Sequence, residues 1–252
     1  MSHANHPHLS PSTSPASAAS SRTRIVLHGA LGRMGQRIAA CVPNEPHCHI
    51  VQALDRDDEL QVSPGAADLV IDFSSDEGAL RALQLAQTLQ TALLVGTTGL
   101  SAATRDAIVR AGDRLPVMLA PNTSLGVAVA RRLVQEAARL LPGFDIDIVE
   151  THHTRKLDAP SGTARSLAEA VQRGTDAPLP PERIHAIRAG DVVGDHVVTF
   201  NGPGERLEIG HFASSRDLFA LGALRIGQWL ARQKPGVHTT DEWFEHYARP
   251  HR

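Results

Sequence analysis

The sequence predicts an α/β protein in two parts: a parallel sheet covered by helices on both faces, then a smaller α+β part. Two observations support this. Short apolar runs alternate with helical patterns from Arg24 to Asn122, as is typical of a parallel sheet. After Asn122 a long helix and several short strands replace that alternation. A sizeable core is feasible, because 42% of the residues are hydrophobic and 21% are charged.

In the first part, short apolar runs bounded by turn residues predict buried strands. They lie at 24–28, 51–54, 69–73, 92–95 and 116–120. Amphipathic spacing predicts helices between them. These helices are expected at about 33–41, at 76–90, and from the N-cap Ser101 to about Asp113.

In the second part, Pro142-Gly143 ends a predicted long helix over about 125–141. A strand at 145–150 and a helix over about 161–173 follow. Further strands are expected at 184–188, 197–201 and 206–211, with Gly202-Pro203-Gly204 as the turn between the last two. Ser214 is expected to open a last helix through Trp229.

Residues 1–22 are mostly Ser, Ala, Pro and His and contain no acidic residue. Such a segment buries too little apolar surface to offset its ordering entropy, so we expect a disordered leader. It lacks the apolar region of a secretory signal, and a transit peptide is the less favoured alternative.

The composition also limits location and partners. Cys41 and Cys48 are too few for a disulfide framework, which favours a reducing, cytoplasmic compartment. No apolar run approaches the ~20 residues that span a bilayer, so no membrane partner is expected. The net charge of −2 argues against nucleic acid as a partner.

The first motif lies between the first strand and the first helix. It consists of Gly29, Ala30, Leu31, Gly32, Arg33, Met34 and Gly35. Glycines let the backbone approach a pyrophosphate, and the helix N-terminus supplies free N–H groups. Asp55 follows at about the 20-residue spacing of a carboxylate that meets the adenosine ribose. The alternatives are a glycine-rich turn without a ligand and an exposed turn carboxylate.

Two further loops follow predicted strands of the same sheet. They are Gly96-Thr97-Thr98-Gly99 and Ala120-Pro121-Asn122-Thr123-Ser124. Loops at the carboxyl ends of parallel strands line the ligand crevice, so these residues could contact the nicotinamide and its ribose. Ordinary turn chemistry explains either loop equally well.

The most specific segment runs from Glu150 to Thr163. His152, His153 and Lys156 lie shortly before a helix start formed by Ser161, Gly162 and Thr163. Cationic side chains beside a helix N-terminus suit carboxylates, and histidine can donate a proton near neutral pH. A solvated polar loop with an N-cap would explain Ser161 but not the cations. Adjacent histidines without further suitably spaced ligands are poor support for zinc, so no metal is expected.

At this point the sequence resembles the dihydrodipicolinate reductase family. The similarity is carried, in order, by GALGRMG, FSSDEG, VGTTG, APNTSLGV, ETHHTRKLDAPSGTA, RAGDVVGDH and RLEIGHFASSR. It extends over about 25–230, and its most specific piece is HH-x-x-K-x-DAPSGT. The shortened segments 55–68 and 174–183 depart from the family pattern, as does the leader.

The resemblance implies a Rossmann-like dinucleotide-binding domain (23–123 with 217–252) and an α+β substrate and tetramerisation domain (124–216). It implies reduction of 4-hydroxy-tetrahydrodipicolinate, a cyclic imine dicarboxylate, with NADH or NADPH. His152 would be the acid/base and Lys156 a second proton donor. The substrate carboxylates would meet His153, Lys156, Ser161, Gly162 and Thr163. The dinucleotide would meet Gly29 to Met34, Asp55, Arg56, Gly96, Thr97, Thr98, Ala120, Pro121, Asn122, Thr123 and Arg216.

Two other functions remain open from the sequence. A different two-domain amino-acid dehydrogenase would not need HH-x-x-K followed by PSGT. A non-catalytic dinucleotide sensor would keep GALGRMG but has no reason to keep a cationic pocket at a helix start.

Overall fold

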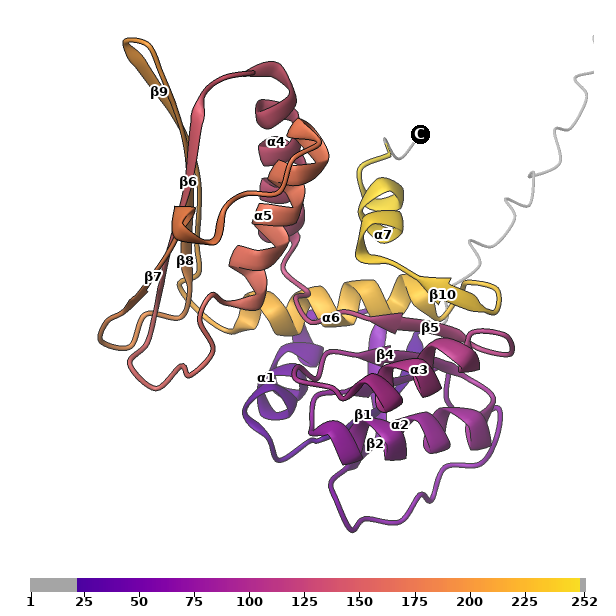
Figure 1. Ribbon diagram of the computed structural model, residues 1–252. Helices are drawn as coiled ribbons and strands as arrows, with labels where there is room; N and C mark the ends of the chain where they lie inside the picture. The colour runs from indigo at the N-terminus through magenta and orange to yellow at the C-terminus, as the bar shows by residue number, and fades with distance from the viewer. Residues whose placement is uncertain (1–21, 250–252) are drawn as a thin grey trace, which may run out of the picture.

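The computed structural model describes residues 22–249. The predicted disordered leader, apart from Arg22, therefore lies outside the described residues. The described chain forms a six-stranded sheet and a separate four-stranded sheet. Figure 1 shows the two sheets with their own helices, and one long helix, α6 (Asp217–Leu230), running between them.

The six-stranded sheet is parallel throughout and has the order β10-β5-β4-β3-β1-β2. Its strands are β1 (Thr23–His28), β2 (Cys48–Leu54), β3 (Leu69–Asp72), β4 (Ala92–Val95), β5 (Pro116–Leu119) and β10 (Gly236–His238). The chain moves outward from β1 to β2 and then returns to place β3 on the other side of β1. This reversal creates a switch point, and ligands of such sheets bind beyond the carboxyl ends of the strands there.

Helices cover both faces of this sheet, as predicted. One face holds α1 (Arg33–Cys41), α6 and α7 (Thr240–Tyr247), and the other holds α2 (Asp76–Leu89) and α3 (Ala102–Ala111). Alternate residues of β1 separate the two cores: Ile25 and Leu27 face the first, and Val26 faces the second. Burial of strands on both faces explains their continuous apolar runs.

The connection between β2 and β3 contains no strand, in agreement with the shortened 55–68 segment. The side chain of Gln52, on β2, holds the middle of this connection in place. The Gln52 amide oxygen accepts backbone N–H bonds from Gln61 and Val62 at 3.0 and 3.2 Å. Arg24 then pairs with Asp68 at 2.7 Å, just before β3 begins.

The second part is α+β, as predicted, with a four-stranded sheet of order β7-β6-β8-β9. It contains α4 (Leu125–Leu140), β6 (Asp145–His152), α5 (Gly162–Thr175), β7 (Ile184–Arg188), β8 (Asp195–Gly202) and β9 (Glu205–Phe212). Only β6 and β7 are parallel neighbours. Both helices pack on one face of the sheet, around Val134, Leu167 and Phe200 (Figure 1).

The end of the chain differs from the sequence prediction. The helix expected from Ser214 begins only at Asp217, because the Ser215 hydroxyl accepts the Asp217 N–H at 3.1 Å in a turn before it. The chain then adds β10 to the edge of the six-stranded sheet and ends its described part with α7. Short 3₁₀ turns lie at Val42–Asn44 and Pro181–Arg183. None of the described helices has the length and apolar character needed to cross a membrane.

Candidate active site

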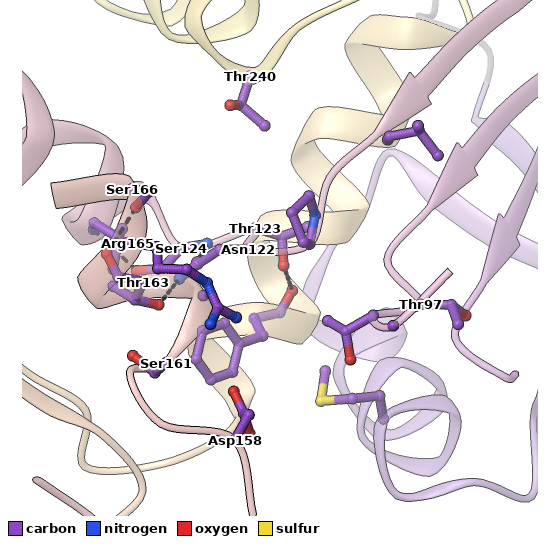
Figure 2. A pocket seen from close by; sticks show the side chains of 18 of the residues that line it. Thr97, Asn122, Thr123, Ser124, Asp158, Ser161, Thr163, Arg165, Ser166 and Thr240 are labelled. Carbon is purple, nitrogen blue, oxygen red and sulfur yellow. Dashed lines mark hydrogen bonds between the residues drawn. The ribbon is translucent and has the colours of Figure 1, made fainter. Parts of the chain in front are cut away.

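A cleft of about 900 Å³ lies between the two parts of the molecule. Figure 2 shows Thr97 on one side, with Ser161, Thr163 and Arg165 on the other and Asn122 and Thr123 between them. The predicted site residues that line this cleft are Arg33, Met34, Thr97, Thr98, Pro121, Asn122, Thr123, His152, His153, Lys156, Ser161, Gly162, Thr163 and Arg216. Residues far apart in the sequence therefore meet in one cavity.

A second cavity of about 460 Å³ adjoins the glycine-rich loop, and Gly29, Gly32, Asp55 and Arg56 line it. The other predicted cofactor residues, Ala30, Leu31, Gly96 and Ala120, line neither cavity. Gly96 instead provides close packing, since a Cβ there would lie 2.1 Å from the Phe73 ring. The predicted set therefore divides between two adjacent cavities and the backbone that supports them.

The glycine-rich loop has the geometry of an anion site. Gly29 has a φ of +78°, and a Cβ on Gly35 would lie 2.2 Å from the Gly29 carbonyl oxygen, so neither position tolerates a side chain. Gly32 is the N-cap of α1 and supplies no side-chain bond, which leaves the first N–H groups of that helix without a cap. Free N–H groups at a helix N-terminus fit the pyrophosphate of a dinucleotide.

Asp55 holds this loop from the end of β2. Its carboxylate accepts N–H bonds from Arg56 and Leu31 at 2.9 and 3.0 Å. These bonds, in that order of effect, lower the pKa of Asp55. Arg81 of α2, which sequence reasoning missed, donates to the carbonyls of Arg56 and Asp58 and so clamps the same turn.

The loop after β4 is anchored by a buried carboxylate. Asp72, at the end of β3, accepts from the Thr97 hydroxyl at 2.6 Å, from Ser74 at 2.5 Å and from His28 at 2.8 Å. Asp72 has no exposed surface. The network fixes Thr97 and explains why this threonine points into the structure rather than behaving as an ordinary turn residue.

The loop after β5 connects the two parts. The Asn122 amide donates to the Thr163 hydroxyl at 2.7 Å, and the Thr123 hydroxyl donates to the Phe219 carbonyl at 2.7 Å. Ser124 then caps α4 by accepting the Val127 N–H at 3.2 Å. One short loop thus contacts α5, α6 and α4.

Positive charge collects on the opposite wall of the cleft. Lys156 is paired with Asp158 at 2.8 Å, so an incoming carboxylate would exchange for Asp158 rather than meet a free ammonium group. His153 is partly buried, and burial together with the nearby Arg216 and Arg155 lowers its pKa. Arg216 lines the cleft from the start of α6.

The N-terminus of α5 closes the same wall. Ser161 caps the helix by accepting the Ala164 N–H at 3.1 Å. Its own N–H donates to Glu150 at 3.0 Å. The N–H groups at the start of a helix have no partner within it, so Gly162 and Thr163 present donors to a ligand in the cleft.

His152 lies at the end of β6 and is 7% exposed. Its Nδ1 is 3.0 Å from Glu150 Oε2. The two atoms are in close contact, but the geometry is not that of an aligned hydrogen bond. His196 packs edge-on against His152 with ring centroids 5.0 Å apart.

Sequence reasoning missed several residues of the site. Glu150 had a readable signal, because Ile146, Ile148, Glu150 and His152 alternate along one face of β6. His196 lies on β8, and no local pattern linked it to the site. Thr240 and Trp243 also line the cleft, but they belong to α7, which was not expected. Arg165 of α5 had no distinguishing pattern.

Glu150, His152 and His196 each offer one ligand atom, and these atoms lie within 4.8 Å of one another. The Glu150 carboxylate also accepts hydrogen bonds from the Arg188 guanidinium at 3.2 Å and from the Ser161 N–H at 3.0 Å. Its charge is therefore balanced by protein groups, an arrangement that does not require a cation.

Two family models match nearly the whole described chain. Residues 23–123 match "Dihydrodipicolinate reductase, N-terminus" and residues 126–244 match "Dihydrodipicolinate reductase, C-terminus". Two relatives are 4-hydroxy-tetrahydrodipicolinate reductases. That of Stenotrophomonas maltophilia (strain K279a) is 44% identical over 85% of this chain and 95% of its own, and that of Xylella fastidiosa (strain M23) is 42% identical over the same shares.

Solved structures share the fold. A dipicolinate-bound dihydrodipicolinate reductase from Paenisporosarcina sp. TG-14 superposes with a TM-score of 0.70 at 22% identity, covering 86% of this chain and 97% of its own. The DAP dehydrogenase of C. glutamicum gives a TM-score of 0.56 at 12% identity, covering 92% and 97%. Because both family models and relatives well above 30% identity cover the chain, it belongs to the dihydrodipicolinate reductase family.

Proposed function

We propose that this chain reduces 4-hydroxy-tetrahydrodipicolinate to tetrahydrodipicolinate with NADH or NADPH, a step of lysine and diaminopimelate biosynthesis. The observation that carries the proposal is the single cleft, which brings the loops after β4 and β5 opposite a cationic wall at the start of α5. A nicotinamide ring and a dicarboxylate can meet there. The relatives' shared activity supports the same assignment.

The cofactor would extend from the cleft into the second cavity. The pyrophosphate would meet the backbone at Gly29 to Met34, and the ribose hydroxyls would meet Asp55 with Arg56 beside it. Thr97, Thr98 and the loop from Ala120 to Thr123 would contact the nicotinamide end. When bound, the reduced nicotinamide supplies a hydride to the substrate.

The opposite wall would bind and protonate the substrate. Its carboxylates would accept bonds from Lys156, His153 and the α5 N-terminus at Ser161, Gly162 and Thr163. Loss of the 4-hydroxyl group as water converts the substrate to a conjugated imine. Hydride addition to that imine builds negative charge, which Lys156 would stabilise. His152, whose Nδ1 faces Glu150, would donate a proton from its other ring nitrogen.

The same proposal gives each part of the chain a task. Residues 23–123 with 217–252 would form the dinucleotide-binding domain, which agrees with the packing of α6 and β10 on the six-stranded sheet. Residues 124–216 would bind the substrate and mediate tetramer formation. A cytoplasmic location would suit this soluble metabolite chemistry and the two free cysteines, Cys41 and Cys48.

The homotetramer has a structural argument. One face of the four-stranded sheet packs on α4 and α5. The other face carries Val149, Ile187, Val197 and Phe212, and no helix within residues 22–249 covers it. Phe212 is 66% exposed and Ile187 47%. Apolar side chains on an open sheet face suit burial against a second copy of the chain.

The two alternative functions lack a specific observation in their favour. The amino-acid dehydrogenase resembles this chain in fold but at low identity. A dinucleotide sensor has no use for a cationic wall and a buried histidine facing the cofactor loops.

A coupled assay tests the proposal. The preceding synthase generates the unstable substrate in place, and the loss of NADH or NADPH absorbance reports its reduction. We expect turnover that depends on the synthase, the cofactor and this chain together. Oxidation of the cofactor that continues without the synthase product, or none in its presence, would contradict the proposed function.

A further inference from the structure

Glu150 lies beside the cleft and has no exposed surface. Oε1 accepts two hydrogen bonds, whereas Oε2 lies in close contact with His152 without an aligned hydrogen bond. Oε1 accepts the Ser161 N–H at 3.0 Å and Arg188 Nη2 at 3.2 Å, and Oε2 lies 3.0 Å from His152 Nδ1. One carboxylate therefore contacts both the proton-donating histidine and the helix start proposed to hold the substrate.

Arg188 connects Glu150 to the loop that carries Lys156. Its guanidinium lies between Glu150 and the loop that carries Lys156. Nε donates to the Lys156 carbonyl at 3.1 Å, and Nη2 also donates to the Asp158 carbonyl. Backbone bonds to Arg188 thus tie the position of the lysine loop to the same carboxylate.

The charge of the Glu150 carboxylate follows from its pKa. Burial by itself would raise the pKa of Glu150, but the contacts from His152 and Ser161 outweigh it and hold the pKa at about 2. The carboxylate is therefore ionised across the neutral range.

The orientation of His152 follows from the same contact. With Nδ1 turned to Glu150, the other nitrogen, Nε2, is the one left for the cleft. Gly194 lies beside that nitrogen, and only the absence of a side chain leaves room there, because a Cβ would lie 3.0 Å from His152 Nε2. A nitrogen lone pair facing this carboxylate would be repelled, so the close contact favours hydrogen on Nδ1 in the neutral ring.

We propose that Glu150 is the positioning residue of this site. It orients His152 for proton donation from Nε2 and, through Ser161 and Arg188, fixes the α5 N-terminus and the Lys156 loop in one geometry. The inference deepens the proposed function and rests on it. No atom of Glu150 needs to touch the substrate.

The decisive variant is Glu150→Gln, which keeps the size of the side chain and removes its charge. We expect kcat to fall by about 10–100-fold, because the imidazolium loses its counter-ion and its orientation. The pH–rate profile should also change, because the charge beside the proposed proton donor is gone. The other charged or titratable groups around this carboxylate and His152 are unchanged in this variant. They are His196 on β8, Arg188 on β7, and His153 and Lys156 on the loop.

Arg188→Met separates the two tasks of the centre. It leaves the Glu150–His152 contact in place but frees the Lys156 loop, so it should raise KM for the dicarboxylate more than it lowers kcat. Asp145→Asn is the matched control. Asp145 lies on β6, the strand that carries Glu150, and it pairs with Arg183 at the surface at 3.2 Å. This control should leave both constants within about twofold.

A wild-type kcat and pH profile in Glu150→Gln would overturn the inference while leaving the proposed function standing. Absence of turnover in the unaltered enzyme would instead remove the proposed function. If Glu150→Gln does not fold, nitrogen-15 NMR of the unaltered protein decides. Hydrogen on His152 Nδ1 in the neutral ring supports the inference, and hydrogen on Nε2 contradicts it.

Discussion

The Asn122 side chain donates a 2.7 Å hydrogen bond to the Thr163 hydroxyl across the cleft between the two parts of the molecule. Asn122 follows the last central strand of the parallel sheet, and Thr163 lies in the first turn of α5. This bond joins the proposed nicotinamide loop directly to the proposed carboxylate site. The two halves of the chemistry therefore meet at one contact.

We predict that ligands close the cleft. Hydride transfer needs the nicotinamide and the imine carbon within van der Waals reach, and the groups that hold them lie on opposite walls. The hinges should be at 122–124 and 214–216, where the chain crosses between the parts. Small-angle scattering of the protein with both NADH and dipicolinate should give a smaller radius of gyration than scattering of the protein with either ligand alone. Identical interdomain angles in ligand-free and ternary crystals would refute closure.

Cofactor choice should depend on Arg56. Asp55 favours ribose hydroxyls and repels a 2′-phosphate, whereas the neighbouring arginine can pair with that phosphate. We expect activity with both cofactors, and Arg56→Ala should weaken NADPH binding by about 10-fold while changing NADH by less than about twofold. Binding is measured by titration of cofactor fluorescence. Arg110→Ala, in the last turn of α3, is the control. Equal losses of affinity for both cofactors in Arg56→Ala would mean that Arg56 does not bind the 2′-phosphate.

Substitutions of Lys156 and His152 should change kcat and KM in different ways. Lys156→Ala removes a charge-assisted contact from both the bound substrate and the transition state, so kcat should fall and KM should rise. His152→Gln should mainly reduce kcat, by about 10²–10⁴-fold, and remove one limb of the pH profile. NADH should still bind both variants. A His152→Gln enzyme with normal rate and pH dependence but weaker substrate binding would move the acid role to Lys156 or water.

The buried His196 should make the protein sensitive to mild acid. Burial, with a smaller effect from His152, lowers its pKa to about 4 from 6.5. Between these values the unfolded chain binds a proton that the folded chain does not. The free energy of unfolding should therefore be full above pH 6.5 and fall by about 3 kcal/mol as the pH drops to 4.

Denaturant titrations at several pH values check this. His196→Asn removes the titrating group, so its stability should depend less on pH across that window than the stability of the unaltered protein. His49→Gln, at an exposed position of β2, should keep the full dependence. Parallel curves for all three proteins would show that His196 does not contribute.

Local pattern was sufficient for most of the fold. The strands Ala92–Val95 and Ile184–Arg188 begin and end where the sequence predicts, since each is a short run between clear turn signals. The N-caps Ser101 and Ser161 are also where they are expected. Prediction failed at the end of the chain because β10 has only three residues and gains its partner, β5, from far away in the sequence. Thr239 and Glu242 form a capping box that could have indicated α7.

The candidate site divides in the same way. Residues within contiguous motifs, such as His152 and Thr163, were named from the sequence, and the structure places them in one cleft. His196 and Arg188 come from separate strands, so only the pairing of β6 with β8 and β7 shows that they reach Glu150. Sequence spacing carries no information about such cross-strand contacts.

Transfer of deuterium tests the central claim most directly. The assay combines the synthase, this chain and a nicotinamide cofactor deuterated at the transferable position of C4, and mass spectrometry follows the product. We predict one deuterium in the tetrahydrodipicolinate product for each cofactor oxidised, with the yield lost in Lys156→Ala and His152→Gln. Cofactor oxidation that places no deuterium in the product would contradict the account.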